Sequence, residues 1–145
     1  MLQTIHKKIK DIFINFQSLF LLLARFMVAY VFFESSKSKW SDIDATAKWF
    51  DSINIPLSTL NAYVVASVEA LGVLLLTLGL FTRLISVTLM VIIVVAILTV
   101  HLPHGFKAVD NGFEIPLYYI LFLFFFLSHG AGKFSLDYLI FRKEQ

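Results

Sequence analysis

The sequence predicts an all-α fold: an integral-membrane bundle of four transmembrane helices, with an amphipathic interfacial helix between the first and second. The 145 residues are 59% hydrophobic and have a mean hydropathy of +0.82, which is more apolar surface than a soluble core of this size can bury. The apolar residues also gather in four stretches, each able to cross a hydrocarbon core of about 30 Å. We therefore expect one membrane domain over residues 1–145.

The four expected spans cover residues 16–36, 57–82, 84–100 and 115–132. The third is uncharged and rich in Val, Ile and Leu. The period of the fourth would also fit a strand, but its length and the apolar context favour a helix. The second and third spans are separated by so few residues that they must form an antiparallel hairpin.

The polar stretch 37–56 predicts the interfacial helix. Its apolar residues recur every three to four positions, with acidic and basic residues between them. They are Trp40, Ile43, Ala47, Phe50 and Ile53. The N-terminal region lacks a small-residue cleavage site, so we interpret it as a retained anchor.

Charge predicts the orientation, because cytoplasmic segments carry an excess of Lys and Arg. The side that holds both termini carries Lys7, Lys8, Lys10, Arg83, Lys133, Arg142 and Lys143. The opposite side carries Lys37, Lys39, Lys48 and Lys107. Seven against four places both termini in the cytoplasm.

Composition excludes some classes of function. The chain has no cysteine, so disulfides and thiolate metal ligands are absent from its chemistry. Its formal charge is only +2 and its basic residues form no patch, so we expect no nucleic-acid partner.

Two ionisable residues fall inside the expected spans, where a charge is costly and usually faces a partner in the bundle. Arg25 lies near the middle of the first span and Glu69 near the middle of the second. Their heights should nearly match, so we expect an Arg25–Glu69 ion pair. The pair would either fix the register of the two helices or form a charged floor beneath a polar cavity. At about 100° per residue, Ser36 and Lys39 share the side of Arg25.

The segment between the third and fourth spans holds the densest polar cluster. His101 and His104 are followed by Asp110, Asn111 and Glu114. Such residues can bind metal, carry protons or hydrogen-bond a headgroup. We expect no metal site, because H-x-x-H beside an acid is common by chance; His101 and His104 would be the ligands if one existed. His101, Lys39 and Glu114 are instead our candidates for a functional group.

The chain also resembles the DoxX family through short motifs in order over about residues 20–138. These are Ala24-Arg25, Ser36 with Lys39, Glu69-Ala-Leu-Gly72, Leu78-Gly79 to Arg83, His101, Asn111 to Glu114, and Gly130 to Asp137. The resemblance implies a small bacterial inner-membrane protein of four helices, related to subunits of quinone-linked oxidoreductase assemblies. It nominates Arg25, Lys39, Glu69, His101, Asn111, Glu114 and Asp137 as functional positions. Of these, we expect Arg25, Glu69, Asn111 and Asp137 to form a buried polar site.

Our leading hypothesis is a membrane subunit that binds a quinone headgroup or anchors a redox protein partner near the quinone pool. The sequence carries no haem pair, flavin motif or dinucleotide loop, so we expect no covalent cofactor and no standalone enzyme. The alternatives are a small ion or solute permeation protein, which would require a homo-oligomer, and a scaffold that assembles other membrane proteins.

Overall fold

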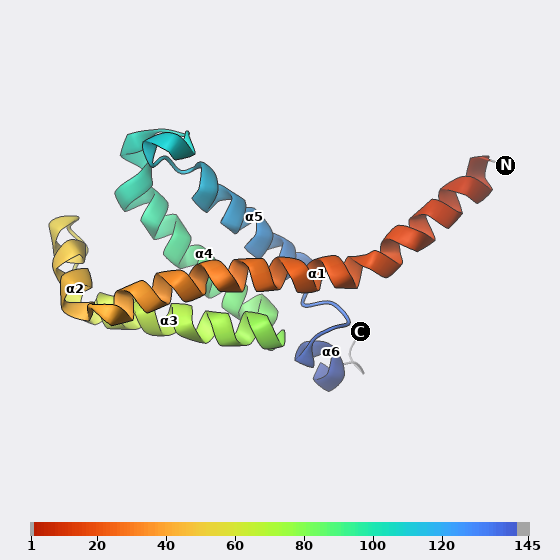
Figure 1. Ribbon diagram of the computed structural model, residues 1–145, viewed down its shortest axis with the longest axis horizontal. Coiled ribbons are helices and arrows are strands. Elements are labelled where there is room, and N and C mark those ends of the chain that lie inside the picture. Colours follow the sequence, from red (N-terminus) through yellow and green to blue (C-terminus); the bar gives the residue numbers. More distant parts are fainter. Residues whose placement is uncertain (1, 142–145) are drawn as a thin grey trace.

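The described part of the computed structural model, residues 2–141 with side chains for residue 13 and residues 16–141, contains helices and no strand (Figure 1). The long helices are α1 (Leu2–Ser41), α3 (Ser58–Leu78), α4 (Thr82–Ala96) and α5 (Glu114–His129). Shorter elements are α2 (Ile43–Ser52), α6 (Leu136–Phe141), the π turn η1 (Ile97–His101), and the 3-10 turns η2 (Leu102–His104) and η3 (Ala108–Asp110).

Three helical segments are long and apolar enough to cross a membrane: Phe16–Ser41, Ser58–Leu78 and Thr82–His104. α5 is equally apolar in character but shorter, at 16 residues. Most of the surface of these helices is exposed in the isolated chain, including large apolar side chains on every one of them. An apolar surface of this extent requires lipid around it.

The helices pack as two antiparallel pairs. α1 lies along α3, and α4 lies along α5 (Figure 1). A single apolar core joins the pairs, with Val28 and Phe32 from α1, Leu76 from α3, Leu89 from α4 and Phe126 from α5. A smaller cluster, in which Ala47 and Phe50 of α2 pack on Ala62 of α3, holds α2 against the N-terminal end of α3.

α1 is longer than a membrane crossing requires. Its 40 residues span about 60 Å at 1.5 Å per residue, about twice a hydrocarbon core. Its N-terminal part projects beyond the other helices in Figure 1. At the other end it continues past the expected end at Ser36 to Ser41, and Asp42 then starts α2 by accepting a hydrogen bond from the backbone N–H of Ala45 at 2.9 Å.

The turn between α3 and α4 begins earlier than expected. α3 ends at Leu78 because Gly79 adopts a left-handed conformation (φ 66°). The N–H of Gly79 then bonds to the carbonyl of Leu76, and that of Leu80 to the carbonyl of Leu75, which is the glycine-terminated Schellman arrangement. α4 consequently begins at Thr82.

α4 ends in a π turn. The backbone N–H of Leu102 bonds to the carbonyl of Ile97, five residues back, where an α-helix would use the residue four back. Such a turn accommodates one extra residue, so residues five apart return to the same face of the helix. Ala96 and His101 are five apart, and this geometry determines which way His101 faces.

Candidate functional site

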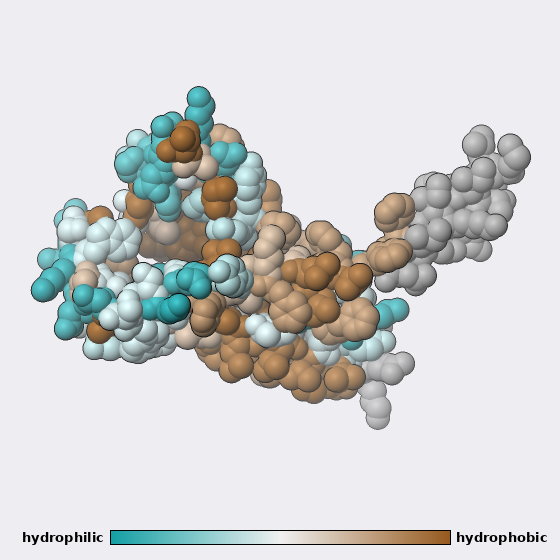
Figure 2. Space-filling view, in the orientation of Figure 1, coloured by the Kyte–Doolittle hydropathy of each residue, from teal (hydrophilic) through white to brown (hydrophobic). Residues whose placement is uncertain are grey.

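A cleft of about 850 Å³ lies between the paired helices. α1, α2, α3, α4 with η1, and the start of α5 all contribute to its wall. Figure 2 shows the hollow between the part of the surface formed by α2 and the part formed by the segment after α4. Apolar side chains, many of them Val and Ile, make up most of the lining. The lining residues with polar groups are Ser35, Lys39, Trp49, Asn54, Asn61, Glu69, Thr88, Thr99, His101 and Tyr119.

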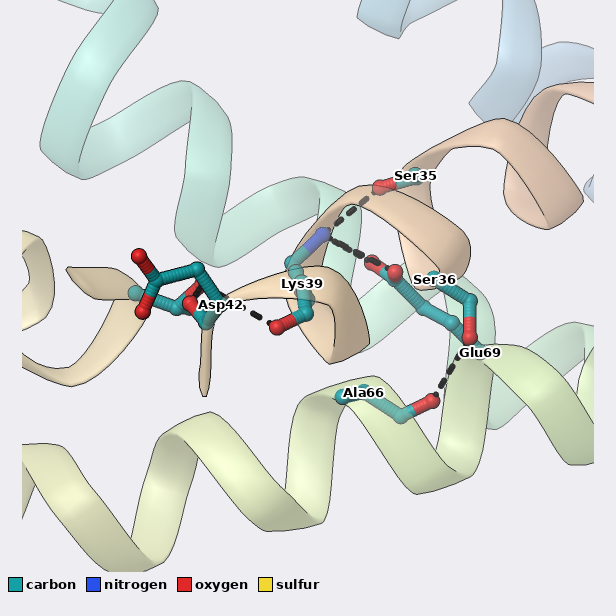
Figure 3. Close-up of polar contacts among 7 residues, drawn as sticks. Ser35, Ser36, Lys39, Asp42, Ala66 and Glu69 are labelled. Atoms are coloured by element: carbon teal, nitrogen blue, oxygen red, sulfur yellow. Dashed lines mark hydrogen bonds and ion pairs between the residues drawn. The ribbon is translucent and has the colours of Figure 1, made fainter. Parts of the chain in front are cut away.

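An ion pair lies in the cleft wall (Figure 3). The Nζ atom of Lys39 is 2.9 Å from Oε2 and 3.1 Å from Oε1 of Glu69, and it donates a third hydrogen bond to Oγ of Ser35 at 2.6 Å. The Lys39 side chain is 18% exposed and that of Glu69 is 4% exposed. All three ammonium protons thus have acceptors, which offsets the cost of removing both charges from water.

The expected Arg25–Glu69 ion pair was wrong, because Glu69 pairs with Lys39 instead. The reason is the register of the antiparallel α1–α3 pair. Arg25 bonds to the carbonyl of Leu76 and Ser36 bonds to that of Ala66, so Glu69 lies about two turns along the pair from Arg25. The two residues therefore do not share a height, as their mid-span positions suggested. Lys39 lies closer to Glu69, and its side chain leans back toward the N-terminus of α1, where it reaches both Ser35 and Glu69.

The polar side of α1 does face α3, as the spacing of its residues predicts. Ser36 is buried and donates to the carbonyl of Ala66 at 3.0 Å, one turn from Glu69 (Figure 3). This bond fixes the register of the two helices beside the ion pair. The cleft thus has a rigid wall on its α1–α3 side.

Arg25 lies at the opposite end of the α1–α3 pair. It is fully buried and donates to the backbone carbonyls of Leu76 and Phe134. Gly79 makes room for it, since a Cβ at that position would overlap the guanidinium. We call this arrangement of Arg25, Leu76, Gly79 and Phe134 the arginine clamp. It holds the end of α3 and the segment after α5 against α1.

Asp137 adjoins the clamp. Its carboxylate accepts hydrogen bonds from the backbone N–H groups of Phe81 at 2.7 Å and Thr82 at 3.0 Å. These are the first free N–H groups of α4, so a residue 55 positions away caps that helix. Asp137 is only partly buried, and it lies at the far end of the protein from the cleft.

Asn111 does not form the expected buried site with Arg25, Glu69 and Asp137, because it is exposed. It contributes through its backbone: its carbonyl oxygen is 2.8 Å from Nδ1 of His101. A carbonyl can only accept, so we assign the ring proton to Nδ1. Nε2 is then the nitrogen left to face a ligand, and no described residue hydrogen-bonds to it.

Glu114 fastens the same segment but does not line the cleft. Its carboxylate accepts from the backbone N–H of Ala108 at 3.0 Å and the hydroxyl of Tyr118 at 2.9 Å. The bond from Ala108, and to a lesser extent the bond from Tyr118, lowers the pKa of the Glu114 carboxyl at the polar start of α5. His104 is exposed and also lies outside the cleft wall. Within the described residues, no group of three or more His, Asp or Glu side chains could hold a metal ion.

Comparison with known proteins assigns the chain to a family. The DoxX family profile matches residues 20–102, which include Arg25, Lys39, Glu69 and His101. The chain belongs to the DoxX family. Relatives of similar length support the assignment. A Haemophilus influenzae (strain ATCC 51907 / DSM 11121 / KW20 / Rd) protein, described as "Uncharacterized protein", is 36% identical over 83% of this chain and 82% of its own length.

A second DoxX relative carries a name that refers to chemistry. "Putative oxidoreductase CatD" of Bacillus subtilis (strain 168) is 31% identical over 83% of this chain and 87% of its own length. Another Haemophilus influenzae protein is 30% identical over 89% of this chain and 96% of its own length. No solved structure matches the chain.

Proposed function

We propose that this DoxX protein is a small subunit of a quinone-associated redox complex in the bacterial inner membrane, and that its cleft holds the quinone headgroup. In this arrangement α5 forms a fourth span beside the three longer ones, and α2 lies at the membrane surface. The distribution of Lys and Arg supports cytoplasmic termini. The cleft then opens toward the opposite side of the membrane.

The observation that carries the proposal is the composition of the cleft wall. An apolar cavity of about 850 Å³ fits the size of small-molecule sites, which pair an apolar lining with a few placed polar groups. Here the polar groups form two stations, the Lys39–Glu69 pair and His101. A quinone headgroup has the same pattern, since it is a flat apolar ring with oxygens on opposite sides.

The two stations suit different forms of that headgroup. A quinone carbonyl oxygen needs a donor, and the Lys39 ammonium provides one by sharing protons it now gives to Ser35 and Glu69. A hydroxyl of the reduced form needs an acceptor, and Nε2 of His101 provides one because Nδ1 donates to Asn111. His101 would thus accept one of the two protons that leave the bound quinol when it is oxidised, and return it when the quinone is reduced.

Electrons must come from a partner, because nothing in the sequence marks a second redox group. The name of the Bacillus subtilis relative supports a redox role, although it specifies neither donor nor acceptor. A redox protein docked on the chain would exchange two electrons with the bound quinone. The chain's residues would bind the headgroup, and His101 would carry one of the two protons, with the other exchanged with water. We therefore propose a subunit and not a standalone oxidoreductase.

The arginine clamp favours a binding site over a permeation pathway. A pathway needs a polar route through the whole bundle, but buried Arg25 is packed against Leu76 and Gly79 at the end opposite the cleft. The cleft lining also stops short of it, with Val31 and Phe32 as the α1 residues nearest to it in sequence.

Quinone binding by two histidine variants tests the proposal. We would reconstitute the purified chain in lipid nanodiscs and measure the affinity for ubiquinone in parent, His101→Phe and His104→Phe. His104 is the matched control, three residues away but outside the cleft wall. We expect His101→Phe to weaken binding of the reduced form roughly tenfold, the worth of about 1.4 kcal/mol, and His104→Phe to leave it unchanged.

The outcome that overturns the proposal is equally direct. If the parent binds neither oxidised nor reduced quinone, the cleft is not a quinone site. A scaffold or assembly role would then gain support from a stoichiometric protein partner that copurifies with the chain, and a permeation role from ion flux in liposomes.

A further inference from the structure

α3 and α4 separate as they leave their common turn, and the cleft lies in the gap. Near the turn the two helices touch: a Cβ added to Gly72 of α3 would lie 3.0 Å from the side chain of Leu89 of α4. Farther from the turn their ribbons diverge (Figure 1). Val64 of α3 and Val91 of α4 both line the cleft, and they are 47% and 58% exposed.

Four exposed residues that line the cleft on α3 and α4 are valines: Val64, Val87, Val91 and Val95. Thr88 and Thr99 of the same wall are also exposed, but their hydroxyls donate to carbonyls of their own helical segment. The valines belong to the two helices that are long and apolar enough to cross the membrane on either side of the gap. In a bundle that crosses the membrane, a gap between these two helices would open to lipid at the side of the bundle.

Polarity changes from one part of the cleft to the other. The ion pair and Ser35 lie on the α1–α3 wall, where side chains are buried or half-buried. Valine predominates on the outer rim between α3 and α4. A site with a polar interior and an apolar rim open to lipid matches a molecule with a polar head and an apolar tail.

We infer that the ligand of this cleft is a long-tailed, membrane-dissolved quinone that enters headgroup first between α3 and α4 and leaves its tail in that gap. The inference rests on the proposed quinone site and adds to it the substrate class and the route. The Lys39–Glu69 pair carries no net charge, so it offers no particular attraction to an anionic solute from water. An uncharged headgroup from the bilayer suits it better.

The test uses two probes that differ only in the tail: ubiquinone-8 and its tail-less headgroup, 2,3-dimethoxy-5-methyl-1,4-benzoquinone. The parent chain in nanodiscs is compared with Val91→Trp and Val87→Trp, which fill the gap at two heights. Val94→Trp is the matched control, since Val94 and Val87 are both 43% exposed but Val94 does not line the cleft. Far-UV circular dichroism and size-exclusion profiles establish which variants fold.

We expect Val91→Trp and Val87→Trp to weaken ubiquinone-8 binding roughly tenfold, because the added ring occupies the place of the tail. The same variants should leave the affinity for the tail-less headgroup within about twofold, and Val94→Trp should leave both affinities unchanged. Either gap variant alone suffices if the other fails to fold.

Different results overturn the two proposals. If the parent binds neither probe, the quinone site itself fails. If the parent binds both probes and the gap variants lose neither or both equally, the site stands but the lateral entry is wrong. If native mass spectrometry shows a parent dimer that Val91→Trp converts to a monomer, a second copy of the chain covers the gap, which also overturns the inference.

Discussion

The two ends of the α1–α3 pair each bury a cation from α1, yet one end is sealed and the other is hollow. Arg25 is fully buried and donates to backbone carbonyls. Lys39 is 18% exposed, pairs with a carboxylate and lines the cleft. The difference lies in the hydrogen-bond partners of the two cations. Arg25 donates to backbone carbonyls at the end of α3 and after α5, whereas Lys39 pairs with the Glu69 side chain, which can rearrange.

Along α1, Arg25 therefore has a structural role, and Lys39 has the properties of a binding residue. Carbonyl partners are fixed by the backbone, so the arginine clamp has a single arrangement. The Lys39 ammonium shares its protons between Ser35 and Glu69, and a ligand acceptor can replace one of them at little cost. We therefore expect the loss of the clamp to prevent folding, whereas substitutions at the cleft should leave a chain that folds and whose ligand binding is changed.

The largest effect should follow Gly79→Ala. The new Cβ would overlap the Arg25 guanidinium and Ser135, and the residue would also need a left-handed backbone. We expect a loss of stability above about 4 kcal/mol, enough to prevent recovery of folded protein. Gly105→Ala is the control for the overlap, because Gly105 also has a positive φ of 76° but no atom lies within 4 Å of the added Cβ. Its ψ of −157° places it in a different glycine-favouring region from Gly79, whose ψ is 42°, so this variant should cost backbone strain alone, about 1–3 kcal/mol. Equal yields of the two folded variants would show that the clamp does not need Gly79.

The next effect should follow the loss of one member of the ion pair. Lys39→Met leaves the Glu69 carboxylate buried without its cation, and we expect a cost of about 3 kcal/mol in denaturant unfolding in detergent. The double variant Lys39→Met/Glu69→Leu removes both charges and should recover most of that loss. A double variant no more stable than Lys39→Met would mean that the pair itself, and not the isolated charge, stabilises the bundle.

A smaller effect should follow Asp137→Asn. The amide keeps one acceptor oxygen but loses the negative charge at the start of α4, so we expect a loss of about 1 kcal/mol. Asp51→Asn serves as the control, since Asp51 is an exposed residue of α2. Thermal unfolding of the two variants in the same detergent measures the difference. Identical midpoints would show that the cap does not stabilise the hairpin of α3 and α4.

Composition and hydropathy were sufficient to predict the class of fold. The all-helical, membrane-type architecture with long apolar helices follows from where the apolar residues gather, and this was confirmed. The DoxX assignment was also confirmed, by the family profile that matches residues 20–102. Both depend on properties that a linear sequence carries directly.

The pairing of charges was less predictable. Glu69 was assigned to Arg25 because both residues lie near the middle of their expected spans, whereas the packed helices place Glu69 beside Lys39. The register of two packed helices is not encoded in the residue spacing of either one. The end of α3 was predictable from the sequence, since Leu78-Gly79-Leu80 has the glycine typical of a helix C-terminus.

Other features of the site could not be predicted from residue patterns. The separation of α3 from α4 depends on how both pack against α1 and α5, which periodicity does not encode. Nothing in the sequence around residues 97–101 distinguishes a π turn from an α-helix. The bond from His101 to Asn111 depends in turn on the fold of the segment between α4 and α5.

Because of the π turn, the number of residues between α4 and His101 decides whether the histidine faces the cleft. With ordinary α-helical geometry, a residue five positions after Ala96 would lie about 140° around the helix from it. The extra residue in the turn is what brings His101 to the cleft. When relatives are aligned, a one-residue gap between α4 and this histidine would therefore identify chains whose histidine is turned away from the cleft, even where the histidine itself is retained.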